Sequence, residues 1–194
     1  AIIIAPGTER DFSAAIADHL DQVTFIVQNE PLGYGHAVLL AKDFTGEDPF
    51  LLMMSDHLYL SLAEESCLSQ LLEVARQAKC PVSAVQPTHE SKLPYYGVVG
   101  GTRVGGHQGL YDITNVLEKP TPTLAEQELI VPGLRAGHYL CFFGMHVLNK
   151  AVMEHLAEAF VESPQKLPLT PSLDATARSE GYLACEIQGL RFNI

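Results

Sequence analysis

The feature that most constrains the fold is the uninterrupted apolar run at residues 50–54, which is followed by Ser55 and Asp56. An apolar run of this length without alternation is typical of a strand that is buried on both faces. Such strands occur in α/β sheets, where ligands collect beyond the carboxyl ends of the strands. The run therefore predicts an α/β fold and makes Asp56 the first candidate for a functional residue.

The remaining apolar patterns alternate between strand and helix in the first half of the chain. Strand patterns lie at residues 2–5, 23–27, 81–85, 96–99, 113–117, 139–147 and 182–194, the last of these as two strands. Helical spacing begins near Thr8 or Asp11 and recurs at residues 37–41, 62–78, 152–160 and 172–178. Residues 105–107 predict a hairpin tip. This order predicts one α/β domain with a mostly parallel sheet that helices cover and that a strand-rich segment near 95–147 extends.

Composition excludes several classes of function. The 194 residues are 47% hydrophobic and 18% charged, as in a soluble globular domain. A net charge of -11 with only 12 Lys and Arg argues against binding to nucleic acid. No apolar stretch approaches the ~20 residues that span a membrane, and the apolar opening is too short for a signal peptide. The four cysteines have no paired spacing, so we expect free thiols in a cytoplasmic protein.

A turn at residues 28–37, with the sequence QNEPLGYGHA, separates a predicted strand from a predicted helix. Its glycines at 33 and 35 would let the backbone approach a flat ligand, because they carry no Cβ. The Gln28 amide offers both a donor and an acceptor, which suits the edge of a pyrimidine. An ordinary strand-to-helix turn is the alternative interpretation, since short glycine motifs are common.

Carboxylates at two predicted strand ends are the other candidates. Asp56 is a hard oxygen ligand of the kind that Mg²⁺ prefers, although it could instead cap a helix. Glu118 could accept hydrogen bonds from sugar hydroxyls and Lys119 could meet a phosphate, although the two could also form a solvated pair. Residues 95–97 (YYG) could shape a sugar pocket or pack before an edge strand. The scattered histidines and the absence of a Gly-x-Ser-x-Gly segment indicate neither a zinc site nor a serine hydrolase.

In their order along the chain, these segments resemble the sugar-nucleotide pyrophosphorylases, and bacterial UTP–glucose-1-phosphate uridylyltransferases most of all. The segments that carry the resemblance are QNEPLGYGHAV, FLLMMSDH, YYGVV, LEKP, AGHYL and LTPSLDATARSEGYLACEIQGLRFNI. The resemblance covers nearly the whole chain, and the first segment is its most specific part. It implies a Rossmann-like sheet of the nucleotide-diphospho-sugar transferase type. It also implies transfer of a nucleotidyl group to a sugar 1-phosphate with release of pyrophosphate.

The resemblance also implies roles for individual residues. The implied nucleotide contacts are Gln28, Pro31 and Gly33, and the implied sugar contacts are Tyr96, Gly97, Glu118 and Gly137. Lys119 would neutralise the sugar phosphate, and Asp56 would be the first carboxylate on Mg²⁺, with position 193 as the second metal ligand. The implied partners are UTP with glucose 1-phosphate, or UDP-glucose. The oligomeric state stays open, although homo-oligomers are common among soluble enzymes.

Three features depart from the family's pattern. The family opens with a strand and a Gly-rich loop that carries an Arg and a Lys, whereas this sequence begins where the second strand is expected. Asn193 stands in place of the second metal carboxylate, and His57 stands in place of a second acidic residue. Relative to the family, residues 1–194 therefore form a single nucleotidyltransferase-like domain that is incomplete at both ends. The missing strand would leave an unpaired strand edge.

Three functional interpretations stay open. The intact candidate residues favour an enzyme whose catalytic domain is one portion of a longer polypeptide, or one that receives the missing strand from another segment or chain. Asn193 and His57 favour instead a catalytically degenerate module that binds a nucleotide sugar or regulates an active homologue. An interaction domain that has kept only the fold is the third interpretation.

Overall fold

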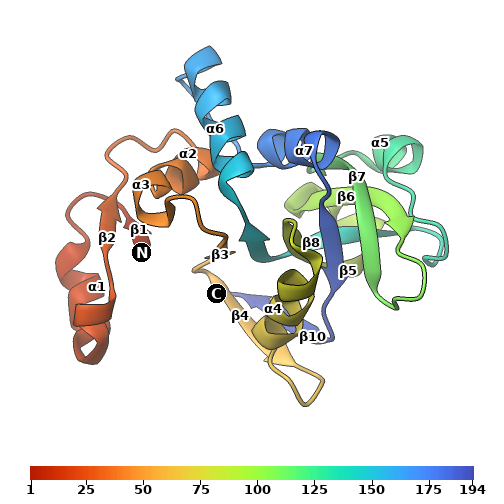
Figure 1. Cartoon of the computed structure of the whole chain (residues 1–194), viewed down its shortest axis with the longest axis horizontal. Coiled ribbons are helices and arrows are strands. Elements are labelled where there is room, and N and C mark those ends of the chain that lie inside the picture. The colour runs from red at the N-terminus through yellow and green to blue at the C-terminus, as the bar shows by residue number, and fades with distance from the viewer.

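A computed structural model describes all residues 1–194 and shows a sheet with helices on both faces (Figure 1). The strands are β1 (Ile2–Ile4), β2 (Phe25–Val27), β3 (Phe50–Met53), β4 (His57–Ser61), β5 (Val82–His89), β6 (Gly97–Arg103), β7 (Leu110–Glu118), β8 (His138–Leu148), β9 (Leu183–Glu186) and β10 (Gly189–Asn193). The α-helices are α1 (Glu9–Ala15), α2 (Tyr34–Leu39), α3 (Lys42–Thr45), α4 (Cys67–Ala78), α5 (Pro122–Glu128), α6 (Lys150–Glu162) and α7 (Thr170–Ser179). Two 3₁₀ helices, η1 (Ala17–Gln22) and η2 (Glu90–Tyr95), complete the set.

The main sheet has six strands in the order β3-β8-β5-β9-β7-β6, with a further pairing between β8 and β6. Only β5 and β9 run parallel in it, and the other pairs are antiparallel. The prediction of a mixed α/β sheet flanked by helices is confirmed, but the prediction that its strands are mostly parallel is wrong. The expectation that the strand at residues 50–54 is buried on both faces is also wrong, because β3 lies at the edge of the sheet and Leu51 and Met53 are exposed. A continuous apolar run carries no information about the direction of the neighbouring strands.

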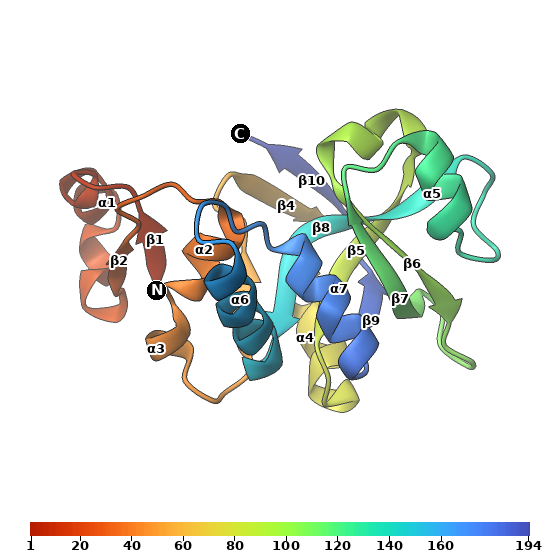
Figure 2. The same ribbon diagram turned by 90° about the horizontal axis from the view of Figure 1, so that it is seen from above.

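Helices bury the two faces of this sheet in separate cores. Leu156 of α6 and Leu173 of α7 pack with Val85 and Leu140 on one face. Leu71 of α4 packs on the other face, against residues of β5, β8 and β9. Figure 2 shows β6 and β7 on the side of the molecule opposite to β1 and β2. This two-sided burial explains why β8, an 11-residue strand, is apolar almost throughout.

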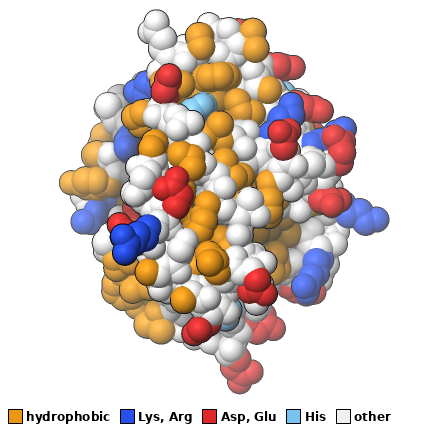
Figure 3. All heavy atoms as spheres, turned by 90° about the vertical axis from the view of Figure 1, so that its left-hand side faces the viewer, with side chains coloured by type: hydrophobic (Ala, Val, Ile, Leu, Met, Phe, Trp, Pro, Cys, Tyr) orange, Lys and Arg blue, Asp and Glu red, His pale blue; other side chains and the backbone are white.

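Two small sheets lie beside the main one. β1 and β2 pair in parallel, and β4 and β10 pair antiparallel as a two-stranded ribbon. β1 pairs only with β2, and β3 pairs only with β8 at the edge of the main sheet. Figure 3 looks onto the end of the molecule with β1 and β2, where many hydrophobic side chains reach the surface. Phe12, Leu20 and Phe44 are among the exposed ones.

The ribbon of β4 and β10 corrects one prediction in detail. We expected a helix from residue 62 directly after the strand at 50–54, but residues 57–61 form β4 and α4 begins at Cys67. The Ser66 side chain caps α4 by accepting a hydrogen bond from the backbone N–H of Ser69 at 3.0 Å. None of the helices combines the length and the apolar character that a membrane crossing needs.

Candidate functional site

One polar pocket of about 590 Å³ collects most of the predicted residues. The predicted residues in its lining are Gly33, Asp56, Tyr96, Gly97, Glu118, Lys119 and Asn193. They come from five separate stretches of the chain, and two of them, Asp56 and Lys119, lie just beyond the carboxyl ends of β3 and β7. Such strand ends are where α/β sheets bind ligands.

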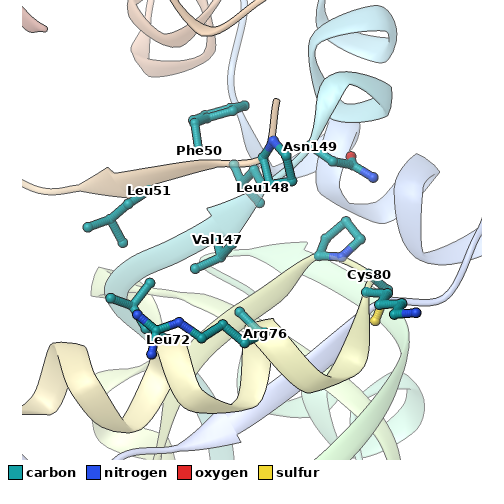
Figure 4. A pocket seen from close by; sticks show the side chains of 12 residues that line it. Phe50, Leu51, Leu72, Arg76, Cys80, Val147, Leu148 and Asn149 are labelled. Carbon is teal, nitrogen blue, oxygen red and sulfur yellow. The ribbon is translucent and has the colours of Figure 1, made fainter. Parts of the chain in front are cut away.

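A second pocket of about 500 Å³ lies between β3, β8 and α4 (Figure 4). Leu51, Leu72 and Val147 line it, and its cations are Arg76 and Lys79. It contains no carboxylate and none of the predicted site residues. We therefore assign the candidate function to the polar pocket.

The β4–β10 ribbon builds one end of the polar pocket. Its register places Asn193 opposite His57 and Arg191 opposite Tyr59, and the His57, Arg191 and Asn193 side chains line the pocket. Asp56 precedes the ribbon, and its backbone oxygen accepts a hydrogen bond from Ile194 N at 2.9 Å. A strand follows Asp56, not a helix, so the alternative of a helix cap is wrong.

Polar contacts fix the side chains at this end. Asp56 Oδ1 lies 3.7 Å from His57 Nε2, and the Asp56 side chain is 56% exposed. His57 Nδ1 lies 3.3 Å from Tyr59 Oη, which donates to the backbone oxygen of Gly144 at 2.9 Å. Burial and the nearby Arg191 guanidinium lower the pKa of His57, and the Asp56 carboxylate partly opposes them.

The side chains at this end could bind a divalent cation that a bound substrate also coordinates. Asp56, His57 and Asn193 offer a carboxylate, an imidazole and an amide, all of which are metal ligands. The chain has no cluster of three or more His, Cys, Asp or Glu side chains that could hold a metal ion. The protein therefore supplies a partial coordination shell, which the phosphate oxygens of a ligand could complete.

The opposite end of the pocket is built by β6, β7 and the start of α7. Gly97 pairs with Glu118 in the sheet, and a Cβ at Gly97 would lie 2.7 Å from the Phe142 ring. Glu118 Oε2 accepts a hydrogen bond from Thr170 Oγ1 at 2.6 Å. Glu118 Oε1 lies 3.8 Å from Lys119 Nζ. These contacts orient one carboxylate and one ammonium group towards the same space.

Thr170 and Arg191 are two of the lining residues that sequence reasoning missed. Thr170 orients Glu118, and no pattern around residue 170 indicates this contact. Arg191 lies over the Tyr96 ring, 4.1 Å from its centroid, and donates to the backbone oxygen of Phe142 at 2.7 Å. Alternation could have identified Arg191, because residues two apart in a strand face the same side and Asn193 was already a candidate.

The turn at residues 28–37 lies at the edge of the pocket. Gln28 Nε2 donates to the backbone oxygen of Gly33 at 3.2 Å and lies 2.9 Å from His36 Nδ1. A Cβ at Gly33 would come within 2.7 Å of the Leu167 oxygen, so this glycine permits close packing of the chain on itself. We had expected it to serve close approach to a ligand. Gln28 and Pro31 are not in the pocket lining, and neither is Gly137, which lies before β8.

A model of the nucleotidyl transferase family matches residues 1–187 of the chain. The chain belongs to this family. The predicted membership of the sugar-nucleotide pyrophosphorylases is confirmed by its relatives. UTP–glucose-1-phosphate uridylyltransferase YngB of Bacillus subtilis (strain 168) is 31% identical over 179 residues, which make up 92% of this chain and 55% of that protein.

Other nucleotidyl transferases agree with this assignment. The UTP–glucose-1-phosphate uridylyltransferase of Streptococcus pneumoniae serotype 4 is 28% identical over 88% of this chain and 54% of its own length. The fold is similar to that of a UDP-glucose pyrophosphorylase solved with UDP-glucose, with a TM-score of 0.75 and 21% identity. That match covers 95% of this chain and 66% of the other. The chain spans slightly more than half the length of these two curated relatives.

Proposed function

We propose that the protein is a UTP–glucose-1-phosphate uridylyltransferase, which forms UDP-glucose and pyrophosphate from UTP and glucose 1-phosphate. The observation that carries the proposal is the polar pocket, where Asp56, Glu118 and Lys119 line one space. The names of the relatives suggest the substrates, and the family resemblance of the segments suggests an orientation for the ligand. The nucleotide would lie towards Gly33 and the sugar towards Gly97.

The sugar end has the chemistry that this orientation needs. Thr170 bonds Glu118 Oε2, so Glu118 Oε1 stays available to accept a hydrogen bond from a sugar hydroxyl. The Lys119 ammonium group, 3.8 Å from that oxygen, would pair with the sugar phosphate. Tyr96 would border the sugar, and the stacked Arg191 limits the movement of its ring.

In the proposed reaction the protein contributes positioning of the substrates and stabilisation of charge. A phosphate oxygen of glucose 1-phosphate attacks the α-phosphorus of UTP, and pyrophosphate leaves, so no protein nucleophile takes part. Asp56 would hold a divalent cation, for which we propose Mg²⁺ or a related metal, and the bound cation would supply positive charge against that developing on the phosphates. Lys119 acts on the same charge from the sugar side.

The first test is calorimetric binding of UDP-glucose together with release of pyrophosphate from UTP and glucose 1-phosphate. Lys119→Met is expected to weaken UDP-glucose binding at least tenfold, the effect of losing one hydrogen bond between charged groups. Lys42→Met is the matched control, because Lys42 is an exposed lysine on α3 and lies outside the pocket.

Each outcome has a definite meaning. Binding and pyrophosphate release by the wild type, with the loss confined to Lys119→Met, would support the proposal. Binding without pyrophosphate release under any divalent metal would favour the alternative of a degenerate binding module. A wild-type protein that binds no uridine ligand would refute both.

A further inference from the structure

His57 has a position in the pocket that the proposed reaction does not yet explain. It is the first residue of β4, and its side chain is only 8% exposed although it lines the pocket. It adjoins Asp56 in the sequence and lies opposite Asn193 in the ribbon. His57 is therefore a direct neighbour of both candidate ligands of the cation.

The hydrogen bonds of Tyr59 determine which nitrogen of His57 carries the proton. The Tyr59 hydroxyl has one hydrogen, which it donates to the backbone oxygen of Gly144, since a carbonyl oxygen cannot donate. Tyr59 Oη can therefore only accept from His57, so His57 Nδ1 carries a hydrogen and donates it. In the neutral ring, Nε2 then has a free lone pair.

That lone pair lies beside the Asp56 carboxylate. His57 Nε2 and Asp56 Oδ1 are 3.7 Å apart, and in the neutral ring neither atom has a hydrogen to share. Two ligand atoms about 2.1 Å from one metal ion are separated by roughly 3 Å. The exposed Asp56 side chain can reach this separation by a small rotation, and a shared cation would remove the repulsion between the two acceptors.

Gly144 provides the space for this arrangement. It has a φ of 92°, and a Cβ there would collide with His57 Nδ1 and lie 2.8 Å from Tyr59 Oη. A histidine that donates through one nitrogen to a fixed acceptor and presents the other is in the form that metal sites use. Tyr59 and Gly144 together form the outer support of such a site.

We propose that His57 Nε2 is a ligand of the divalent cation, together with Asp56. As a consequence, the site favours transition metals such as Mn²⁺ and Co²⁺ over Mg²⁺. An imidazole suits transition metals, whereas Mg²⁺ prefers oxygen ligands, and Asn193 offers only a neutral amide in place of a second carboxylate. The inference rests on the proposed function for the identity of the pocket, but it concerns the metal alone.

The test is electron spin-echo spectroscopy of the protein with Mn²⁺, which detects coupling to a ligand nitrogen, together with calorimetric titration of Mn²⁺ and Mg²⁺. Nitrogen coupling is expected in the wild type and in His107→Gln, a control in the exposed hairpin tip between β6 and β7. His57→Gln is expected to lose the coupling. His57→Asp is expected to lose it too and to lower the ratio of Mn²⁺ to Mg²⁺ affinity at least tenfold.

Tyr59→Phe tests the outer support without removing a ligand. It keeps the ring but not the acceptor for Nδ1, and it is expected to weaken Mn²⁺ binding about tenfold while the nitrogen coupling persists. Mn²⁺ binding without nitrogen coupling in the wild type would overturn the inference, as would an unchanged affinity ratio in His57→Asp. UDP-glucose titration in the same samples separates the two claims. If UDP-glucose still binds while the Mn²⁺ result overturns the inference, the proposed function stands. If the wild type binds neither UDP-glucose nor Mn²⁺, both the inference and the proposed function are refuted.

Discussion

His146, a buried residue in the lining of the pocket, gives the sharpest test of the electrostatics there. It lies on β8 and is 3% exposed, and its Nδ1 is 2.5 Å from Ser83 Oγ. Ser83 Oγ in turn lies 2.5 Å from Tyr182 Oη, so three polar side chains share one buried network. No charged group compensates a proton on the ring, and burial lowers the pKa of His146 from 6.5 to about 4.

This shift makes the stability of the protein depend on pH in a definite direction. The unfolded chain binds a proton on His146 as the pH falls below 6.5, whereas the folded protein does so only near pH 4. Stability is therefore complete above pH 6.5 and is lost as the pH falls towards 4. A shift of this size corresponds to about 3 kcal/mol in total, of which about 2 kcal/mol is lost by pH 5.

The assay is urea unfolding at pH 7.5 and pH 5.0 of the wild type, His146→Gln and the exposed control His19→Gln. The glutamine variant removes the titrating group and keeps a polar side chain that can bond Ser83. Its unfolding free energy is expected to fall about 2 kcal/mol less between the two pH values than that of the wild type. The reasoning fails if the wild type and His146→Gln lose the same amount, or if His19→Gln changes the loss as much as His146→Gln does.

Two further predictions concern packing and positioning. A Cβ at Gly35 would lie 2.6 Å from the backbone oxygen of Pro168, so Gly35→Ala is expected to reduce the unfolding free energy by about 1–3 kcal/mol; an unchanged urea midpoint would contradict this. Thr170→Val removes the hydrogen bond to Glu118 at nearly constant volume, and UDP-glucose binding is expected to weaken about tenfold with little change in melting temperature. Equal losses of binding and thermal stability would show that Thr170 has a merely structural role.

The sequence predicted those parts of the fold that burial determines locally. The strand at residues 50–54 was predicted from its continuous apolar run, but the inference that both of its faces are buried was wrong, because β3 is an edge strand and Leu51 and Met53 are exposed. β4 was missed because Leu58 and Leu60 are exposed and its pairing depends on β10 more than 120 residues later. The prediction of strand direction was wrong for a different reason: an apolar run looks the same whether the neighbouring strand is parallel or antiparallel.

The site was predictable where chemistry lies at the end of a strand. Asp56, Glu118 and Lys119 follow apolar runs, and the pocket gathers all three. The support of His57 was not predictable, because the Gly144 oxygen that fixes Tyr59 is 85 residues away along the chain. The turn glycines were selected for close approach to a ligand, whereas their closest neighbours in the structure are backbone atoms of residues 167–168.

The two ends of the pocket and the turn at its edge belong to three different structural units. This division determines which parts of the protein a bound ligand would stabilise. The proposed sugar end belongs to the six-stranded sheet, the proposed nucleotide end to the turn before α2 and its first residue, and the proposed cation end to the β4–β10 ribbon. A two-stranded ribbon is marginally stable by itself and depends on the elements that it packs against, here through Tyr59 on Phe143. A nucleotide sugar with its cation would contact all three units at once. Its binding energy would therefore stabilise the ribbon more than the main sheet, because a two-stranded ribbon has fewer internal contacts than a six-stranded sheet.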